Sequence, residues 1–177
     1  MSVNRSEREA VPLAIVGCGG MGRRHLFGLK ELYDSGQANV ELVAACDLRR
    51  ENAEHLAQEA QELLGDKPLI FQDMAEMASA LPDLQAVDVV TDAGSHHVVV
   101  PTALELGFHV LCEKPLALTM RGCNRVIEAE RHHDKVLSVA ENYRRDPMSR
   151  LTRELLRAGV IGKPFVLFNI SAGGGDT

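Results

Sequence analysis

Three glycines stand at the spacing G-x-G-x-x-G directly after an apolar run of strand length, residues 13–16. Gly17 can make the tight turn away from the strand, Gly19 lets the main chain approach a pyrophosphate closely, and Gly22 lets a following helix pack against the sheet. The first N–H groups of that helix and the positive end of its dipole then face the phosphates. The spacing, the preceding strand and the helical pattern after it predict a dinucleotide site.

An acidic residue, Asp47, ends the next apolar run, 25 residues beyond Gly22 and close to where a ribose-binding acid is expected. Its carboxylate can accept hydrogen bonds from the adenosine ribose hydroxyls; the alternative is an N-cap for a helix that begins near Arg50. Arg49 and Arg50 can pair with a 2′-phosphate, which favours NADP, or remain solvated charges. Because Asp47 repels that phosphate, we expect NAD as the cofactor, with NADP as the alternative.

Segments of strand and helix pattern alternate along the chain and must position these residues. Apolar runs predict strands at 13–16, 40–47, 69–71, 87–91, 109–112 and 135–140, and helical spacing or capping residues predict helices at 21–35, 51–64, 74–80, 95–107 and 119–133. The alternation predicts an α/β fold, a Rossmann doubly wound parallel sheet. Pro101 falls inside one helical segment, so either the first turn there is irregular or the regular helix starts at the proline.

Several polar residues stand where predicted strands end. Ligands of such sheets bind at the carboxyl ends of the strands, and those ends carry Thr91, Asp92, Glu113, Lys114, Glu141 and Asn142. As an ammonium, Lys114 can hydrogen-bond a substrate oxygen, and with a pKa lowered by burial it can also move a proton. The alternative is a surface ion pair with Glu113. A cis bond before Pro115 would aim Lys114 into the cleft.

Composition narrows the class of protein. The chain has 177 residues, 45% of them apolar, and a net charge of −6, which suits one globular domain or slightly more and argues against a nucleic-acid binder. Its apolar stretches fall short of the ~20 residues that cross a membrane, and residues 1–10 resemble a flexible leader. Cysteines 18, 46, 112 and 123 lack C-x-x-C spacing, and three of them lie in or beside apolar runs. We therefore expect buried thiols, no metal site and a cytoplasmic protein.

Longer motifs resemble the glucose–fructose oxidoreductase/inositol dehydrogenase (Gfo/Idh/MocA) family. The matching stretches are 16–22, 45–47, 87–90, 103–119, which contains Glu-Lys-Pro, and 141–145; the resemblance extends from residue 12 to about 168. It implies an NAD(P)-dependent oxidoreductase that transfers hydride between a nicotinamide and a carbinol or carbonyl of a sugar, polyol or related compound. It also implies a Rossmann domain at 11–142 and, at 143–177, the beginning of an incomplete α+β domain for substrate binding and oligomerisation.

The resemblance also implies roles for individual residues. The cofactor-binding set is Gly17, Cys18, Gly19, Gly20, Met21, Gly22, Asp47, Thr91, Asp92, His96, Glu113, Lys114 and Asn142. Lys114 is the expected catalytic residue, and with Tyr143 and Arg144 it would contact the substrate. Two alternatives stay open: Asn142 can instead satisfy a turn, and Arg144 and Arg145 can instead pair with Glu141 and Asp146. Many members have Thr-Pro-Asn where this chain has Thr91-Asp92-Ala93, so contacts usually made by that Asn are not expected here.

The last residues predict a strand at 165–170 with two largely apolar faces, an edge that invites self-association into a homo-oligomer. Family members continue further and include an Asp-x-x-x-His pair whose His often serves as the acid/base. The chain therefore resembles a fragment or a truncated product. Two alternatives to the enzyme follow: a non-catalytic dinucleotide-binding module, and an inactive truncated product. For the isolated chain we expect NAD(H) binding with little or no turnover.

Overall fold

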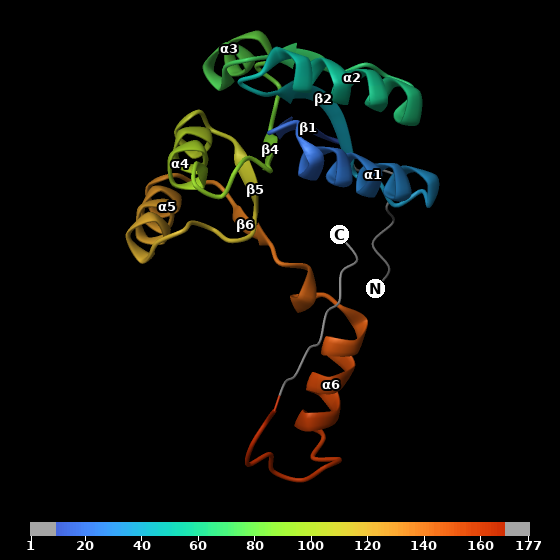
Figure 1. The fold of residues 1–177 in the computed structure, drawn as a ribbon, viewed down its shortest axis with the longest axis vertical. Helices are drawn as coiled ribbons and strands as arrows, with labels where there is room; N and C mark the ends of the chain where they lie inside the picture. The colour runs from blue at the N-terminus through green and yellow to red at the C-terminus, as the bar shows by residue number, and fades with distance from the viewer. Residues whose placement is uncertain (1–9, 169–177) are drawn as a thin grey trace, which may run out of the picture. The chain divides into compact units, whose positions relative to one another are not determined.

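The structure, a computed structural model, describes residues 10–168 (Figure 1). The chain divides into two compact units, Met1–Ala140 and Glu141–Thr177, which are described separately. The expected leader, apart from residue 10, lies outside the described residues. Within residues 10–168, no helix is both long and apolar enough to cross a membrane.

The first unit contains a six-stranded parallel sheet, which confirms the predicted fold class. The strands are β1 (Val11–Val16), β2 (Val40–Cys46), β3 (Leu69–Phe71), β4 (Ala86–Val89), β5 (His109–Glu113) and β6 (Leu137–Ala140), in the spatial order β3-β2-β1-β4-β5-β6. The order reverses between β1 and β4, where such sheets hold their ligands. Val16 is in register with Cys46 on one side and Val89 on the other, so the carboxyl ends of three strands meet there.

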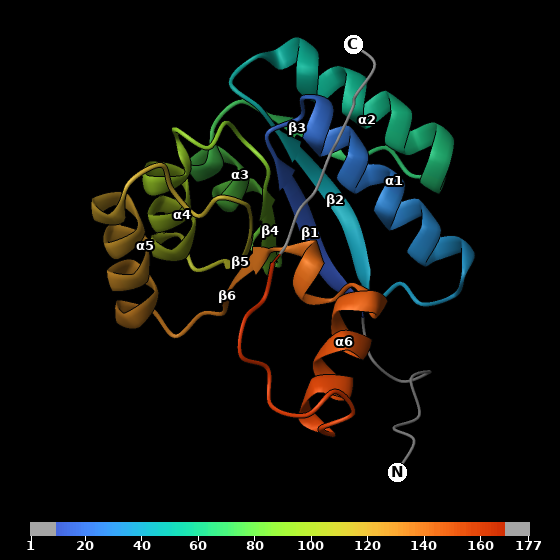
Figure 2. The same ribbon diagram turned by 60° about the horizontal axis from the view of Figure 1, so that its bottom comes forward.

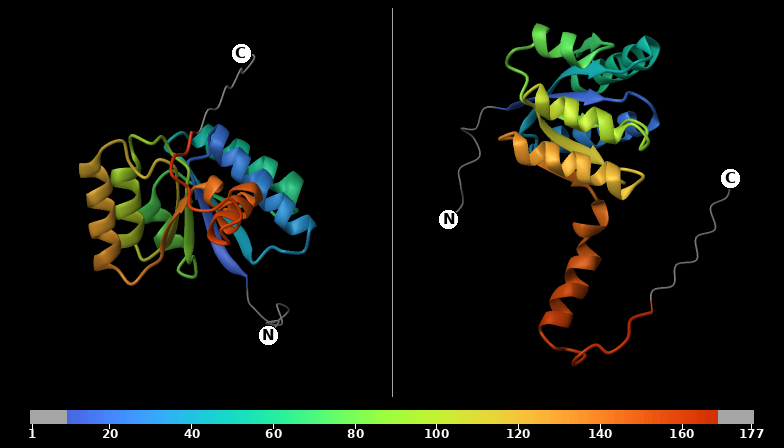
Figure 3. Two further views of the ribbon diagram at one scale, coloured as in Figure 1. Left: turned by 90° about the horizontal axis from the view of Figure 1, so that it is seen from below. Right: turned by 90° about the vertical axis from the view of Figure 1, so that its left-hand side faces the viewer.

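Helices cover both faces of this sheet (Figures 2 and 3). They are α1 (Gly20–Asp34), α2 (Arg50–Leu64), α3 (Met74–Ala80), α4 (His96–Glu105) and α5 (Met120–His132). On the α1–α2 face, Ile15 packs among Leu26 and Leu56, and on the opposite face Val87 and Val89 pack among residues of α3, α4 and α5. Successive strand residues point to opposite faces, so β1 and β2 contribute buried residues to both cores.

Local sequence accounts for most helix boundaries. The Asp73 carboxylate accepts hydrogen bonds from the Ala75 and Glu76 N–H groups, and the Thr119 hydroxyl accepts one from Gly122, as their positions before a helix predict. Helix α4 runs through Pro101 instead of starting there, so the second alternative for that segment is wrong. At its start the Ser95 carbonyl accepts from both Val98 and Val99, a bifurcated pattern common at helix ends.

The second unit differs more from expectation. It contains a short 3-10 helix (Asn142–Arg144) and α6 (Pro147–Arg157), a helix that the sequence analysis did not predict. The Asp146 carboxylate accepts from the Ser149 N–H, and Pro147 begins the helix. The predicted strand at 165–170 is wrong for residues 165–168, which form no strand, and its last two residues lie outside the described part. A strand needs a hydrogen-bonded neighbour, and Phe165 is 98% exposed.

Candidate functional site

The glycine turn after β1 uses each glycine for a different reason. Gly17 has φ +99°, and a Cβ there would lie 2.7 Å from the Thr91 nitrogen. A Cβ on Gly22 would lie 2.3 Å from the Gly17 carbonyl oxygen, so α1 can approach the turn only with glycine at this position. By contrast, a Cβ on Gly19 would meet no atom within 4 Å. Gly17 and Gly22 therefore shape the turn, and the space beside Gly19 is free for a ligand.

The start of α1 is open to an anion. Gly19 is its N-cap and supplies no side-chain hydrogen bond, whereas Asp73 and Thr119 cap α3 and α5. The first N–H groups of a helix have no partner within the helix, and they carry its positive dipole end. The main-chain cradle beside Gly19 therefore fits the pyrophosphate of a dinucleotide.

Asp47, the residue after β2, connects this turn to the start of α2. Its Oδ2 accepts a hydrogen bond of 2.7 Å from the Cys18 N–H. Its Oδ1 accepts from the Arg49 N–H at 2.8 Å and from the Asn52 amide at 3.3 Å. Arg49 is the N-cap of α2, so Asp47 supports the helix start from two residues before it. A carboxylate has about four acceptor positions, which leaves capacity for a ribose hydroxyl.

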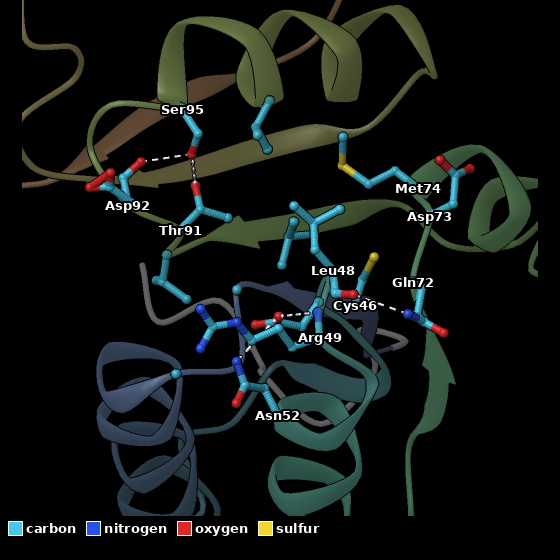
Figure 4. A pocket seen from close by; sticks show the side chains of 16 residues that line it. Cys46, Leu48, Arg49, Asn52, Gln72, Asp73, Met74, Thr91, Asp92 and Ser95 are labelled. Carbon is cyan, nitrogen blue, oxygen red and sulfur yellow. Dashed lines mark hydrogen bonds between the residues drawn. The ribbon is translucent and has the colours of Figure 1, made fainter.

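A cavity of about 470 Å³ lies at the carboxyl ends of β1, β2 and β4 (Figure 4). Five residues predicted to bind cofactor line it: Gly17, Gly19, Asp47, Thr91 and Asp92. Sequence reasoning missed other residues of its walls, among them Leu48, Asn52, Gln72, Met74 and Val99. Gln72 comes directly after β3, and Leu48 is the second residue after β2. The rule that ligands bind at strand ends could therefore have found both. The apolar walls and the carboxylate suit an adenosine.

The loop after β4, which lacks the Pro-Asn of many proteins in the family that the sequence resembles, forms a compact turn. The Ser95 N–H donates to the Asp92 carbonyl at 2.8 Å, and the Gly94 N–H donates to Asp92 Oδ2 at 3.3 Å. The Ser95 hydroxyl oxygen lies 2.8 Å from Thr91 Oγ1 and 2.7 Å from the Asp92 carbonyl oxygen. These bonds hold Thr91 and Asp92 on the cavity wall.

His96, which the sequence predicts to lie beside the cofactor, is the first residue of α4. Its side chain is buried, with Nδ1 2.8 Å from the Pro115 carbonyl oxygen and Nε2 3.1 Å from the Thr91 carbonyl oxygen. Both ring nitrogens are therefore directed at main-chain acceptors. The ring joins the loop after β4 to the loop after β5.

Lys114 follows the last residue of β5 and is exposed, and its bond to Pro115 is cis. Its main-chain N–H donates to Glu113 Oε2 at 2.6 Å. Among residues 10–168, the Lys114 ammonium forms no ion pair, so the alternative pairing with Glu113 is not present. The burial that proton transfer by Lys114 would require is also not observed. The exposed ammonium can serve as a hydrogen-bond donor to a substrate oxygen.

Sequence reasoning missed a group of three titratable side chains beside Lys114, in which Asp88 and Glu113 are buried and His25 is partly exposed. His25, on α1, has Nδ1 2.6 Å from Asp88 Oδ2 and Nε2 3.3 Å from Glu113 Oε1. The hydrogen bond to Asp88 raises the pKa of His25, with further increases from the charges of Asp88 and Glu113 that outweigh the effect of burial. The available signal was Asp88 itself, a charge inside the apolar strand Ala86–Val89, because a buried carboxylate requires a partner.

The cysteines behave as small apolar residues, as expected from the sequence. Cys18, Cys46 and Cys112 are buried, and burial raises the pKa of each thiol to about 12. Since the thiolate is the reactive form, these three side chains contribute packing and no nucleophile.

Asn142, Tyr143 and Arg144, predicted to contact cofactor or substrate, belong to the second unit. The Asn142 carbonyl accepts hydrogen bonds from Arg145 and Asp146 N–H, so its main chain forms a turn. Within the described residues, Arg144 and Arg145 form no ion pair. The two carboxylates proposed as their partners, Glu141 and Asp146, accept main-chain N–H groups instead.

Comparison with known proteins identifies the family. Residues 11–141 match the model of the Gfo/Idh/MocA oxidoreductases, described as an oxidoreductase family with an NAD-binding Rossmann fold. The chain belongs to this family. The expected fold and an NAD cofactor are thereby confirmed, and the match covers the glycine turn, Asp47 and Lys114.

Relatives within the family are dehydrogenases of sugars and polyols. The chain is 34% identical over 152 residues to a D-apiose dehydrogenase of Paraburkholderia graminis, covering 86% of this chain and 38% of the relative. It is 32% identical over 161 residues to an inositol 2-dehydrogenase/D-chiro-inositol 3-dehydrogenase of Lacticaseibacillus casei, covering 89% of this chain and 43% of the relative. The chain therefore spans about two fifths of the length of these relatives.

A solved structure agrees with the fold. The crystal structure of a myo-inositol dehydrogenase from Lactobacillus casei, in complex with NAD(H) and myo-inositol, has a TM-score of 0.77 and 31% identity to this chain. The match covers 88% of this chain and 43% of that one.

Proposed function

We propose that this chain is the cofactor-holding part of an NAD-dependent dehydrogenase that acts on a carbinol of a sugar or polyol. The observation that carries the proposal is the cavity at the carboxyl ends of β1, β2 and β4, where Asp47 and the open side of Gly19 face one space. The printed activities of the relatives, apiose and inositol dehydrogenation, support the substrate class.

The residues of the chain would divide the work as follows. The cradle beside Gly19 and the start of α1 would hold the pyrophosphate, and Asp47 would accept a ribose hydroxyl. NAD, when bound, supplies the hydride acceptor. Lys114 would donate a hydrogen bond to the substrate oxygen through its exposed ammonium and stabilise negative charge on that oxygen. Glu113, buried and bonded to the Lys114 N–H, would fix the main chain from which Lys114 projects.

The binding half of this proposal is tested by calorimetric titration of the chain with NAD⁺, NADH and NADP⁺. We expect heat with NAD⁺ and NADH and weaker binding of NADP⁺, because Asp47 repels a 2′-phosphate. Gly19→Ala places a methyl group where no protein atom lies within 4 Å, so the fold should persist while phosphate binding weakens about 10- to 100-fold, or ~1.4–2.8 kcal/mol.

Gly28→Ala is the matched control, because that Cβ also meets no atom within 4 Å but lies on the exposed side of α1, away from the cavity. Equal affinities of the two variants, or no heat from any nucleotide with the unmodified chain, would contradict the proposal.

For the chain alone we propose binding with little or no turnover, because it spans about two fifths of its dehydrogenase relatives. A non-catalytic binding module makes the same prediction for the isolated chain. To separate the two, the mass of the native protein is determined and the native protein is then assayed with NAD⁺ and inositols or apiose. NADH production supports the enzyme, and binding without NADH production supports the module.

The remaining parts of the proposal concern organisation and location. The division of the chain after Ala140 supports the domain boundary predicted at residue 142, which limited proteolysis can test. The exposed apolar residues Phe165 to Phe168 support self-association, and sedimentation that shows monomers at every concentration would contradict it. The four free cysteines support a cytoplasmic location, which cell fractionation can test.

A further inference from the structure

Three titratable side chains from distant parts of the sequence meet beneath the Lys114 loop. Asp88 is on β4, Glu113 ends β5, and His25 reaches both from α1. Asp88 and Glu113 are 4% and 9% exposed, and the His25 side chain is 18% exposed. Two buried carboxylates at hydrogen-bond distance from one ring are strongly unfavourable unless the ring carries the compensating charge.

The Glu113 side chain connects His25 to the proposed catalytic residue. Its Oε1 faces His25 Nε2, and its Oε2 accepts the hydrogen bond from the Lys114 N–H. The two oxygens of one carboxylate are rigidly linked, so rotation of the group to follow the histidine also changes the bond to Lys114. On the far side of the loop, His96 holds the Pro115 carbonyl.

We propose that His25 is a positioning residue for Lys114: it holds Glu113 in the orientation that fixes the main chain of Lys114 and thereby the origin of its side chain. The role of Lys114 in the reaction rests on the proposed function above, whereas the coupling from His25 to the Lys114 main chain is a property of the chain itself. His25 touches neither cofactor nor substrate in this role.

The charge state of His25 controls this coupling. A protonated ring donates to both carboxylates, whereas a neutral ring has one N–H and can donate to only one. The first cause of the raised pKa of His25 is its hydrogen bond to Asp88, so the neutral ring keeps that bond more readily than the longer one to Glu113.

Two other titratable groups lie on α2, which packs against α1, and on β5, which carries Glu113. On α2, Glu59 is paired with Arg23 at 2.6 and 2.7 Å. Cys112 on β5 stays a neutral thiol, because burial, Asp88 and Glu113 raise its pKa to about 12. The groups that face the ring are therefore Asp88 from β4 and Glu113 from β5.

The test is an NMR titration of the full ¹⁵N-labelled chain without nucleotide, following the Lys114 amide and the His25 ring from pH 6 to 10. We expect the Lys114 amide signal to move with the same midpoint as the His25 ring, at a pH above the ordinary value for histidine. In His25→Gln, which keeps an NH₂ donor group and cannot titrate, the Lys114 amide should no longer move over this range.

His132→Gln is the matched control, because His132 is exposed at the end of α5 and bonds the Glu128 carbonyl; the Lys114 titration should be unchanged in it. A Lys114 amide that stays fixed while His25 titrates, or that titrates equally in His25→Gln, overturns the proposal. If His25→Gln does not fold, the two midpoints in the unmodified chain decide the matter. Nucleotide binding is measured separately, so a chain that binds no NAD(H) but shows the coupled titration refutes the proposed function and leaves this inference intact.

Discussion

The two ends of the candidate site stabilise their carboxylates in different ways. At the glycine turn, Asp47 accepts two main-chain N–H groups, from Cys18 and Arg49, and remains on the wall of a cavity. Beside Lys114, Asp88 and Glu113 are buried and share one histidine. Main-chain N–H groups keep their protons at any physiological pH, whereas a histidine can lose its own. The hydrogen bonds at the first end therefore do not change with pH near neutrality, whereas those at the second end depend on the protonation of His25.

The largest effect on stability is expected when His25 is removed. His25→Leu leaves two buried carboxylates without a counter-charge, and we expect it to lower the free energy of unfolding by ~3–5 kcal/mol, the usual result of removing one partner of a buried pair. Adding Asp88→Leu should recover part of the loss, because only one buried carboxylate, Glu113, then remains, and it still accepts the Lys114 N–H. Chemical denaturation measures both. A loss of under ~1 kcal/mol in the single variant would show that the group of three is not coupled.

At the other end, the expected effect falls on binding. Asp47→Asn keeps one oxygen acceptor and replaces the other oxygen with an NH₂ group, which opposes either the Cys18 N–H or the Arg49 N–H. We expect NADH affinity to fall by ~1–3 kcal/mol, about 5- to 150-fold, and the preference for NAD⁺ over NADP⁺ to shrink. Fluorescence titration with NADH and competition with NADP⁺ measure both. Unchanged affinity would place the ribose elsewhere.

The dependence of stability on pH compares the two ends directly. The folded-state pKa of His25 is raised above its unfolded value, so the folded protein binds its proton more tightly than the unfolded chain does. The resulting stabilisation is fully present below the unfolded pKa and is lost as the pH rises through the folded pKa. Urea unfolding across this window should show stability falling in the unmodified chain and in Asp47→Asn. The fall should disappear in His25→Leu, and its persistence there would assign it to another group.

The smallest expected effect is the change in stability caused by glycine-to-alanine substitutions in α1. Gly28 lies inside α1 with no atom within 4 Å of its Cβ position, so Gly28→Ala should stabilise the protein by ~0.5–1 kcal/mol through helix propensity. Gly22→Ala, blocked by the Gly17 carbonyl, should instead lower stability. Thermal unfolding compares the pair. Equal effects would mean that α1 can shift away from the turn.

The sequence was sufficient for features set by local patterns. The glycine spacing, the apolar runs and the capping residues Asp73 and Thr119 place the strands and helices of the first unit closely. Helix α6 was missed, although Asp146 and Pro147 form a recognisable helix start. Apolar alternation at 165–168 suggested a strand, but alternation alone does not supply a hydrogen-bonded neighbour.

The candidate site was predicted less completely, because its contacts join distant residues. His25 and Glu113 are 88 positions apart, and no local pattern indicates that they meet. The alternative ion pair of Glu113 with Lys114 is not formed, and one oxygen of Glu113 faces His25 instead, a contact that the sequence did not predict. The position of His96 within the predicted helix was correct, but the burial of its ring between two carbonyls depends on the loops after β4 and β5.

The Asp47 carboxylate accepts main-chain hydrogen bonds from both Cys18 and Arg49, and this affects any attempt to redesign nucleotide preference. A single exchange at this position for a small or cationic residue would remove repulsion toward a 2′-phosphate, but it would also release the Cys18 N–H from its acceptor. An engineer who wants NADP selectivity must therefore supply that amide with a new acceptor in the same step, for example from a neighbouring side chain. Otherwise the gain in selectivity comes with a loosened turn.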